Sequence, residues 1–210
     1  MPSVNTRVFY SKTDRAKYIS ALDMNNCAIR AIRRSKLPVW ATEGFNPHTY
    51  VAFMLPLSLG QEGTHEAMDF RLLEDVPFEE VKERLNAALP PDIRAVEVAV
   101  PKYKYQDIAA AKYRIESDID IEKFRAFMES DRILTEKKTK KGIITVDLKP
   151  LVYECEASED ALVLRLPAGN ELSINPTLLL DAYKAQTGGE ISRLRIIRTN
   201  TYIADGTEFY

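Results

Sequence analysis

The chain has 210 residues, of which 45% are apolar and 29% are charged, with 29 Lys and Arg against 31 Asp and Glu. This composition is typical of a folded, water-soluble protein and excludes an intrinsically disordered one. No apolar run approaches the roughly 18 residues of a membrane-spanning helix and residues 1–10 lack the regions of an export signal, so we expect a cytoplasmic protein that contacts no membrane.

The first half of the chain predicts strands and helices in alternation. Residues 6–12 have the β-branched and aromatic content of a strand. Ser20 is a typical helix cap with Asp23 three positions later, and Pro38 prevents this helix from continuing much beyond residue 36. The elements that follow are a short strand at 39–42, an apolar strand at 50–55, a flexible turn at Gly60 and Gly63, a strand at 66–73, a helix at 78–88 and a strand at 93–100.

If residues 39–42 and 50–55 count as one interrupted strand, the order is β-α-β-β-α-β, which is that of a ferredoxin-like split βαβ sandwich. After a junction at residues 101–109 the pattern starts again, with extra strands. Its elements are strands at 110–117, 133–137, 143–149, 152–157, 161–166 and 192–203, and helices at 121–129 and 176–186. We therefore predict an α+β protein of two ferredoxin-like sandwiches packed together, with domains at 1–100 and 110–210.

Two lysine-rich segments have two possible roles each. The tyrosines and lysines of the junction could stack on bases, and the hairpin tip at residues 138–142 could grip phosphates. Both segments are also ordinary solvated surface, since lysines protect a hairpin from edge-to-edge aggregation.

Charge is distributed unevenly along the chain. Residues 1–60 carry eight Lys and Arg against three Asp and Glu, whereas residues 61–131 carry ten against seventeen. This asymmetry favours an anionic partner for the amino-terminal part, or a contact between basic and acidic parts of the same protein.

The cysteines and histidines are too few for common metal sites. Cys27 and Cys155 stand 128 positions apart without a CxxC pair, and His48 and His65 are the only histidines. This pattern disfavours a disulfide framework, a structural zinc site and a cysteine-bound iron–sulfur cluster. We therefore predict neither a metal nor a cofactor.

Three arginines share one face of the helix that begins after Ser20. Arg30 lies at helical contact spacing from both Arg33 and Arg34, and each like-charge pair costs about 0.2–0.5 kcal/mol in an isolated helix. Asp23 or an external phosphate would relieve this repulsion. The alternative is a solvated face that pairs with the acidic segment at 61–131.

The segment after this helix predicts an irregular loop with binding groups. Gly44 permits positive φ, and Pro47 holds Asn46 in an extended conformation, so that the loop presents Phe45, Asn46 and His48. A single histidine without a positioned partner is more typical of a structural hydrogen bond than of catalysis.

Several short motifs in the first 90 or so residues resemble the radical-SAM-linked protein family, a bacterial domain of undefined function. One departure is Ala21, which stands where the family pattern usually has histidine. The motifs are Phe9, Lys12, Ile19-Ser20-x-Leu22-Asp23, Arg30 with Arg33-Arg34, Leu37-Pro38, Gly44-Phe45-Asn46-Pro47-His48, Pro56-Leu57-x-Leu59-Gly60 and Glu66-x-x-Asp69.

The resemblance implies a domain fused to, or encoded beside, a radical SAM enzyme of the cobalamin-binding type, often near genes for RNA processing or ribosomal proteins. The chain lacks the CxxxCxxC motif of the radical enzyme, so we expect an accessory protein with the radical SAM enzyme as partner. We favour a non-catalytic module that binds tRNA, another RNA or another phosphate-bearing ligand, and we assign no catalytic residue. The expected ligand-binding residues are Lys12, Ser20, Asp23, Arg30, Arg33, Arg34, Phe45, Asn46 and His48.

Two other functions stay open. The first is an acid/base enzyme that uses Asp23, Asp69 and His48, which requires these side chains to converge within hydrogen-bond reach. The second is a protein-binding adaptor for the radical SAM enzyme. Whether any reaction is catalysed is not decided by these patterns.

Overall fold

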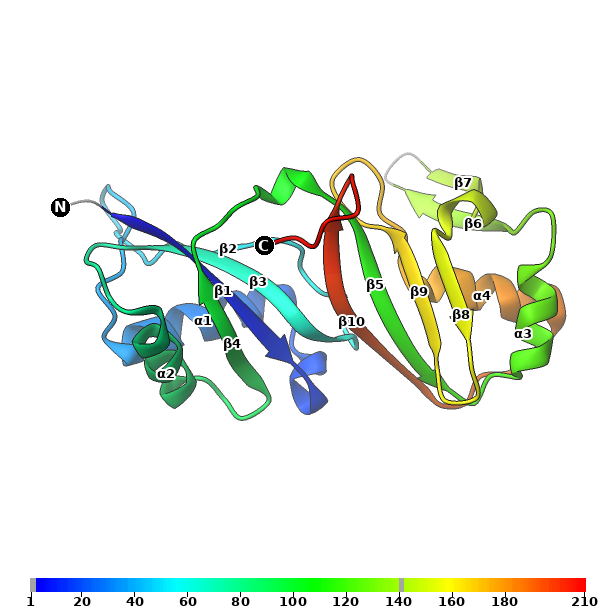
Figure 1. Ribbon diagram of the computed structural model, residues 1–210, viewed down its shortest axis with the longest axis horizontal. Coiled ribbons are helices and arrows are strands. Elements are labelled where there is room, and N and C mark those ends of the chain that lie inside the picture. Colours follow the sequence, from blue (N-terminus) through cyan, green and yellow to red (C-terminus); the bar gives the residue numbers. More distant parts are fainter. Residues whose placement is uncertain (1–2, 140–141) are drawn as a thin grey trace. The chain divides into compact units, whose positions relative to one another are not determined.

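The computed structural model describes residues 3–139 and 142–210 of the chain (Figure 1). These residues form ten strands and four α-helices, in two compact units. Unit 1 comprises Met1–Tyr105 with Phe209–Tyr210, and unit 2 comprises Gln106–Glu208. The strand pairs within each unit are antiparallel, which confirms the expected α+β class. No α-helix of the described residues is long and apolar enough to cross a membrane.

Unit 1 is one antiparallel sheet with two helices. Its sheet has the order β4-β1-β3-β2. The elements are β1 (Val4–Lys12), the 3₁₀ helix η1 (Asp14–Tyr18), α1 (Ala21–Ser35), β2 (Ala52–Phe53), β3 (Glu62–Leu72), α2 (Phe78–Ala88) and β4 (Ile93–Ala99).

Local signals determine both ends of α1. The Ser20 hydroxyl accepts a hydrogen bond from the Asp23 backbone N–H at 3.1 Å and donates one to the Asp23 carboxylate at 2.7 Å. Lys36 ends the helix in a left-handed conformation with φ 54°, and Pro38 cannot extend it. The predicted cap is confirmed.

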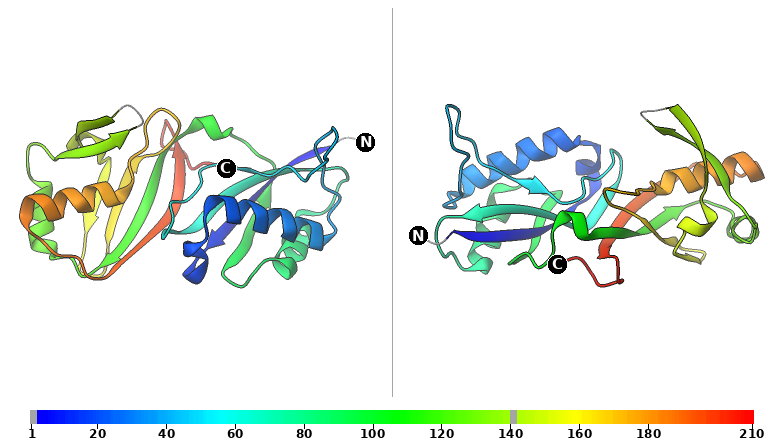
Figure 2. Two further views of the ribbon diagram at one scale, coloured as in Figure 1. Left: turned by 180° about the vertical axis from the view of Figure 1, so that it is seen from behind. Right: turned by 90° about the horizontal axis from the view of Figure 1, so that it is seen from above.

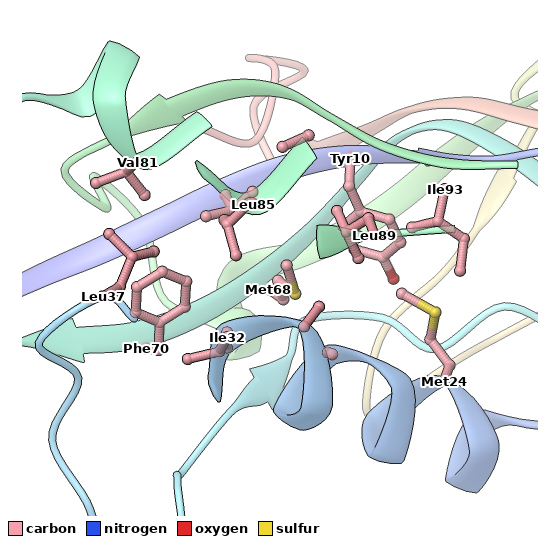
Figure 3. Packing of buried hydrophobic residues seen from close by; sticks show 14 of the residues in the cluster. Tyr10, Met24, Ile32, Leu37, Met68, Phe70, Val81, Leu85, Leu89 and Ile93 are labelled. Carbon is pink, nitrogen blue, oxygen red and sulfur yellow. The ribbon is translucent and has the colours of Figure 1, made fainter. Parts of the chain in front are cut away.

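Both helices cover the same face of this sheet. Met24 and Ile32 of α1, Val81 and Leu85 of α2 and Met68 of β3 belong to one buried cluster between the helices and the sheet (Figure 3). Met24 and Ile32 are eight positions apart and Val81 and Leu85 are four apart, spacings that place each pair on one face of its helix, so each helix buries a single stripe. This cluster is the core of unit 1.

The opposite face of the sheet is also covered, by segments near the ends of unit 1. Arg7 and Phe9 on β1 are each only 1% exposed. The Phe209 ring lies 4.3 Å from the Arg7 guanidinium, and the Tyr210 ring lies 5.2 Å from that of Phe9. Tyr103, whose carbonyl accepts a hydrogen bond from Arg7, lies on this face as well, so residues 103 and 209–210 cover the side of the sheet away from the helices.

Unit 2 is a second antiparallel sheet with two helices and a separate hairpin. The sheet strands of this unit have the order β10-β5-β9-β8, and in the described residues β6 and β7 pair with each other as a separate hairpin. The 3₁₀ helix η2 (Tyr105–Asp107) precedes it. The elements are β5 (Ile108–Ser117), α3 (Ile121–Met128), β6 (Leu134–Thr139), β7 (Gly142–Asp147), the 3₁₀ helix η3 (Lys149–Leu151), β8 (Glu154–Ala157), β9 (Leu162–Pro167), α4 (Pro176–Thr187) and β10 (Leu194–Ile203).

The core of unit 2 includes an aromatic trio. The rings of Phe124, Phe127 and Tyr183 lie 5.6–5.9 Å apart, and all three side chains are buried. They join α3 to α4, and Leu164 of β9 is also fully buried. The predicted hairpin at 133–149 is confirmed, but residues 140 and 141 of its predicted lysine-rich tip lie outside the described residues.

Three local predictions for unit 1 were wrong. Residues 39–42 form isolated bridges, Val39 with Leu72 and Ala41 with Thr49, and the second strand shrinks to Ala52–Phe53. Gly63 lies inside β3, opposite Lys12, instead of in a flexible turn. A side chain at Gly63 would meet the Glu66 carboxylate at 2.3 Å, so close packing explains this glycine.

Candidate functional site

A pocket of about 390 Å³ lies between α1 and the end of α2. This volume is within the range of small-molecule sites. Positions three and four apart on α1 face the same way, which brings its polar residues together on one wall. The residues that line the pocket are Asp23, Asn26, Cys27, Arg30 and Arg34 from α1, and Ala88, Leu89 and Pro90 from the end of α2.

In the described part of the chain, the two arginines of this pocket form no ion pair. Among the described residues, no carboxylate lies within ion-pair distance of Arg30, Arg33 or Arg34. Asp23 shares the pocket, but its carboxylate accepts a hydrogen bond from Ser20. The predicted repulsion on α1 is therefore not relieved by an ion pair within the described part of the chain.

Arg34 also has a structural role, which Arg84 mirrors. Arg34 Nη2 donates to the Ala88 carbonyl at 2.6 Å, at the carboxyl end of α2. In return, Arg84 Nε donates to the Ser35 carbonyl at 2.9 Å and its Nη2 donates to the Lys36 carbonyl, at the end of α1. Each guanidinium satisfies carbonyls at the negative end of the other helix. This exchange holds Arg34 at the pocket wall and leaves several of its five N–H groups available.

Cys27 lines the same pocket, three positions before Arg30 and seven before Arg34 on α1. Partial burial raises the pKa of its thiol, and the charges of Arg34 and Arg30 only partly oppose this effect. A thiol with a raised pKa stays protonated at neutral pH and is a poor nucleophile. The pocket therefore offers hydrogen-bond donors and positive charge, without an activated nucleophile at Cys27.

The second cluster of predicted residues is the loop at 43–48, between α1 and β2 (Figure 2). Thr42 N–H donates to the His48 carbonyl at 2.8 Å, and His48 N–H donates to Thr42 Oγ1 at 3.1 Å. His48 Nδ1 lies 2.9 Å from Thr42 Oγ1 and 3.3 Å from the Asn46 carbonyl. His48 closes the loop, and Phe45 at its tip is fully exposed.

The predicted residues therefore fall into separate groups. Asp23, Arg30 and Arg34 share the pocket, whereas Arg33 is exposed outside its lining. Ser20 acts as the cap of α1. Among the described residues, no hydrogen bond, ion pair or cation–ring contact joins the three arginines to Phe45, Asn46 or His48.

Lys12, at the end of β1, lies apart from both the α1 pocket and the loop at 43–48 in the described structure. It is only 3% exposed, and its ammonium group donates to the Ile19 carbonyl at 3.2 Å. With Ala21 and Pro56 it lines a small cavity of about 40 Å³, distinct from the α1 pocket. Several of the motif residues thus gather around the start of α1.

The side chains proposed for acid/base chemistry have three different sets of neighbours. Asp69 accepts two hydrogen bonds from Arg7, each at 2.8 Å. Asp23 contacts Ser20, and His48 contacts Thr42. Within residues 3–139 and 142–210, none of the three carboxylate or imidazole groups contacts another of them, and no cluster of His, Cys, Asp and Glu could hold a metal ion.

Sequence reasoning missed part of the pocket. Asn26 and Cys27 could have been found, because they lie three and four positions after Asp23 and before Arg30. The wall formed by residues 88–90 could not, since it depends on how α2 packs against α1. The capping role of Arg84 carried no local signal either.

Comparison with known protein families places the chain in one of them. The sequence model of a family described as "Uncharacterized protein conserved in bacteria" (DUF2344) matches residues 5–179. The match runs through unit 1 and into α4 of unit 2, well beyond the 90 or so residues that carry the motifs. None of the curated proteins compared with the chain matches it. The expected bacterial domain of undefined function is confirmed, and the chain belongs to the DUF2344 family.

Proposed function

We propose that this protein is a non-catalytic accessory module that binds a phosphate-bearing ligand, foremost RNA, in the pocket between α1 and the end of α2. The observation that carries the proposal is the pair of arginines, Arg30 and Arg34, on one wall of a pocket of about 390 Å³ without a carboxylate partner in the described residues. An anion in this pocket would remove the repulsion between them.

The other polar groups of the pocket suit the same ligand. Arginine binds phosphate through two parallel N–H···O bonds, and such charge-assisted bonds are stronger than neutral ones. The Asn26 amide can donate to a phosphate oxygen, and the Asp23 carboxylate can accept from a ribose hydroxyl. Contacts of this kind fix the position of an RNA backbone without reading its sequence.

We infer the partner from the family motifs. Their resemblance to the radical-SAM-linked family supports a radical SAM enzyme of the cobalamin-binding type as the protein that this module serves in the cytoplasm. Two cysteines in 210 residues cannot supply the three thiolates of a CxxxCxxC cluster, which supports an accessory role.

We also infer that both units are ferredoxin-like. Unit 1 has the element order β-α-β-β-α-β and the strand order β4-β1-β3-β2. Unit 2 repeats this arrangement with the strand order β10-β5-β9-β8 once the β6–β7 hairpin is set aside as an insertion after α3. Both orders agree with a split βαβ sandwich.

Charge reversal tests the binding proposal. The variants Arg30→Glu and Arg30→Glu/Arg34→Glu are compared with Lys123→Glu/Arg132→Glu, which makes the same change of charge on exposed residues of unit 2. Binding of labelled tRNA is measured by fluorescence anisotropy at salt concentrations of about 50–200 mM, a range over which affinity that depends on phosphate contacts falls steeply.

We expect Arg30→Glu to weaken binding by roughly 10- to 100-fold, which corresponds to losing a hydrogen bond to a charged group. The slope of log K against log salt should fall by about one for each phosphate contact removed. Equal affinities of the pocket variants and the unit 2 control would refute the proposed site. Circular dichroism confirms that each variant is folded.

A further inference from the structure

The loop at residues 43–48 is held in a defined shape. The Thr42 N–H donates to the His48 carbonyl, the His48 N–H donates to the Thr42 hydroxyl, and the His48 ring lies against that hydroxyl. The adjacent residues Ala41 and Thr49 form a β-bridge. At its turn Gly44 has φ 122°, a conformation that other residues rarely adopt. The tip of the loop is thus presented by a closed stem.

The tip places an aromatic ring in water. Phe45 is fully exposed, whereas Phe9, Phe70, Phe124, Phe127 and Phe209 are buried. An aromatic side chain of this size dominates the energetics of interfaces when it becomes covered. A closed loop that exposes such a ring is suited to insert it against a partner.

Two more aromatic rings flank the stem of the same loop, and a cation of β3 lies over one of them. The Arg71 guanidinium lies 5.3 Å over the Trp40 ring, and Tyr50 meets that ring edge-on with centroids 6.4 Å apart. Tyr50 is 53% exposed. Among the described residues, Arg71 has no ion-pair partner, so its charge is available beside the rings.

The charge around the loop selects the kind of partner. From the start of α1 to the end of the loop, residues 21–48 carry four cations, Arg30, Arg33, Arg34 and Lys36, against two acids, Asp23 and Glu43. Aromatic rings combined with a surplus of arginine and lysine are the features with which proteins bind unpaired nucleic acid, where rings stack on bases and cations follow the phosphates. A cationic surface of this kind is complementary to a polyanion.

We propose that the Phe45 loop stacks on an unpaired base of single-stranded RNA, so that the ligand is an RNA with an unpaired segment or end. This inference rests on the proposed function, because the phosphates of the same strand would occupy the arginine face of α1. The exposed amide of Asn46 stands next to Phe45 and can bond a base edge.

The test compares two ligands of equal charge. One is a 12-nucleotide oligouridylate, and the other is the same ribose-phosphate chain without bases. The variants are Phe45→Ala, Phe45→Tyr as the control that keeps a ring, and Arg30→Glu. Affinity is measured by anisotropy of the labelled strand, and fluorescence of Trp40, the single tryptophan of the chain, reports binding at the loop stem.

Phe45→Ala should weaken binding of the oligouridylate by roughly 5- to 150-fold, as for other removed stacking rings, and leave binding of the base-free strand unchanged. Phe45→Tyr should retain the wild-type affinity. Arg30→Glu should weaken both ligands. Unchanged oligouridylate binding by Phe45→Ala would overturn the stacking proposal while the pocket stands, whereas failure of the wild type to bind either strand would overturn both.

Discussion

The Arg7–Asp69 pair provides the sharpest test of how unit 1 is held together. Arg7 is 1% exposed, and its Nε and Nη2 each lie 2.8 Å from the Asp69 carboxylate. Nη2 also donates to the Tyr103 carbonyl at 3.0 Å, whereas Nη1 has no hydrogen-bond partner in the described residues. One carboxylate therefore compensates a fully buried guanidinium, and Asp69→Asn would remove that charge without changing the shape of the side chain.

The loss of stability in each variant depends on which charge of the pair remains without its partner. Removing one partner of a buried ion pair costs about 3–5 kcal/mol, because the other charge stays uncompensated. We expect the lower end for Asp69→Asn, about 3 kcal/mol, since the amide oxygen still accepts one hydrogen bond. Arg7→Met should cost less, because the Asp69 side chain is 25% exposed and its remaining charge can be hydrated.

Urea unfolding followed by Trp40 fluorescence measures this difference. Trp40 is the only tryptophan and lies in unit 1, so its signal reports unit 1 without assuming that the whole chain unfolds in one step. The double variant Arg7→Met/Asp69→Asn should be more stable than Asp69→Asn alone, since no buried charge is left. Equal midpoints for Asp69→Asn and the wild type, or a larger loss for Arg7→Met, would refute this account of the pair.

Three further effects are expected. Phe209→Ala should lower the stability of unit 1 by about 3 kcal/mol or more, because it empties a buried site over Arg7; the same urea assay checks it. Arg84→Met should lower it by about 1 kcal/mol, since two carbonyls at the end of α1 lose a donor; thermal unfolding measures this loss. Hydrogen bonding from Arg165 lowers the pKa of Glu154 in the folded state. The stabilisation by the Glu154 carboxylate is therefore present above the usual glutamate pKa and is lost as pH falls through the lowered pKa. The melting temperature of the wild type should thus fall more steeply in acid than that of Glu154→Gln.

The elements that sequence alone located well are those with local signals at their ends. The helix at 78–88 agrees with α2 at both ends, and the cap at Ser20 fixed the start of α1. In these segments the apolar period and the end signals indicate the same structure. Both kinds of signal are local and do not depend on tertiary contacts.

Long-range contacts explain what could not be predicted. The return of Phe209 to the sheet of unit 1 is an encounter between residues about 200 positions apart, and no pattern near residue 209 indicates it. Gly63 looked like a turn residue because the sequence around it does not show that it pairs with Lys12 of β1, about 50 positions away, inside β3. Likewise, helical spacing predicted that Arg30 and Arg34 would share a face, but not that the end of α2 would close a pocket over them.

Cys27 gives an independent test of where the ligand binds, since its thiol lines the same pocket as Arg30 and Arg34. Burial raises the pKa of this thiol, so its modification by a disulfide reagent should be slow at neutral pH and accelerate as pH rises toward that pKa. A ligand that fills the pocket should slow the reaction in proportion to occupancy, about tenfold at a ligand concentration ten times Kd. Cys155 is exposed in unit 2 and serves as the control, with Cys27→Ser and Cys155→Ser assigning each rate. If RNA binds by anisotropy while the Cys27 rate is unchanged, the ligand does not occupy the α1 pocket, and binding must use another surface of the protein.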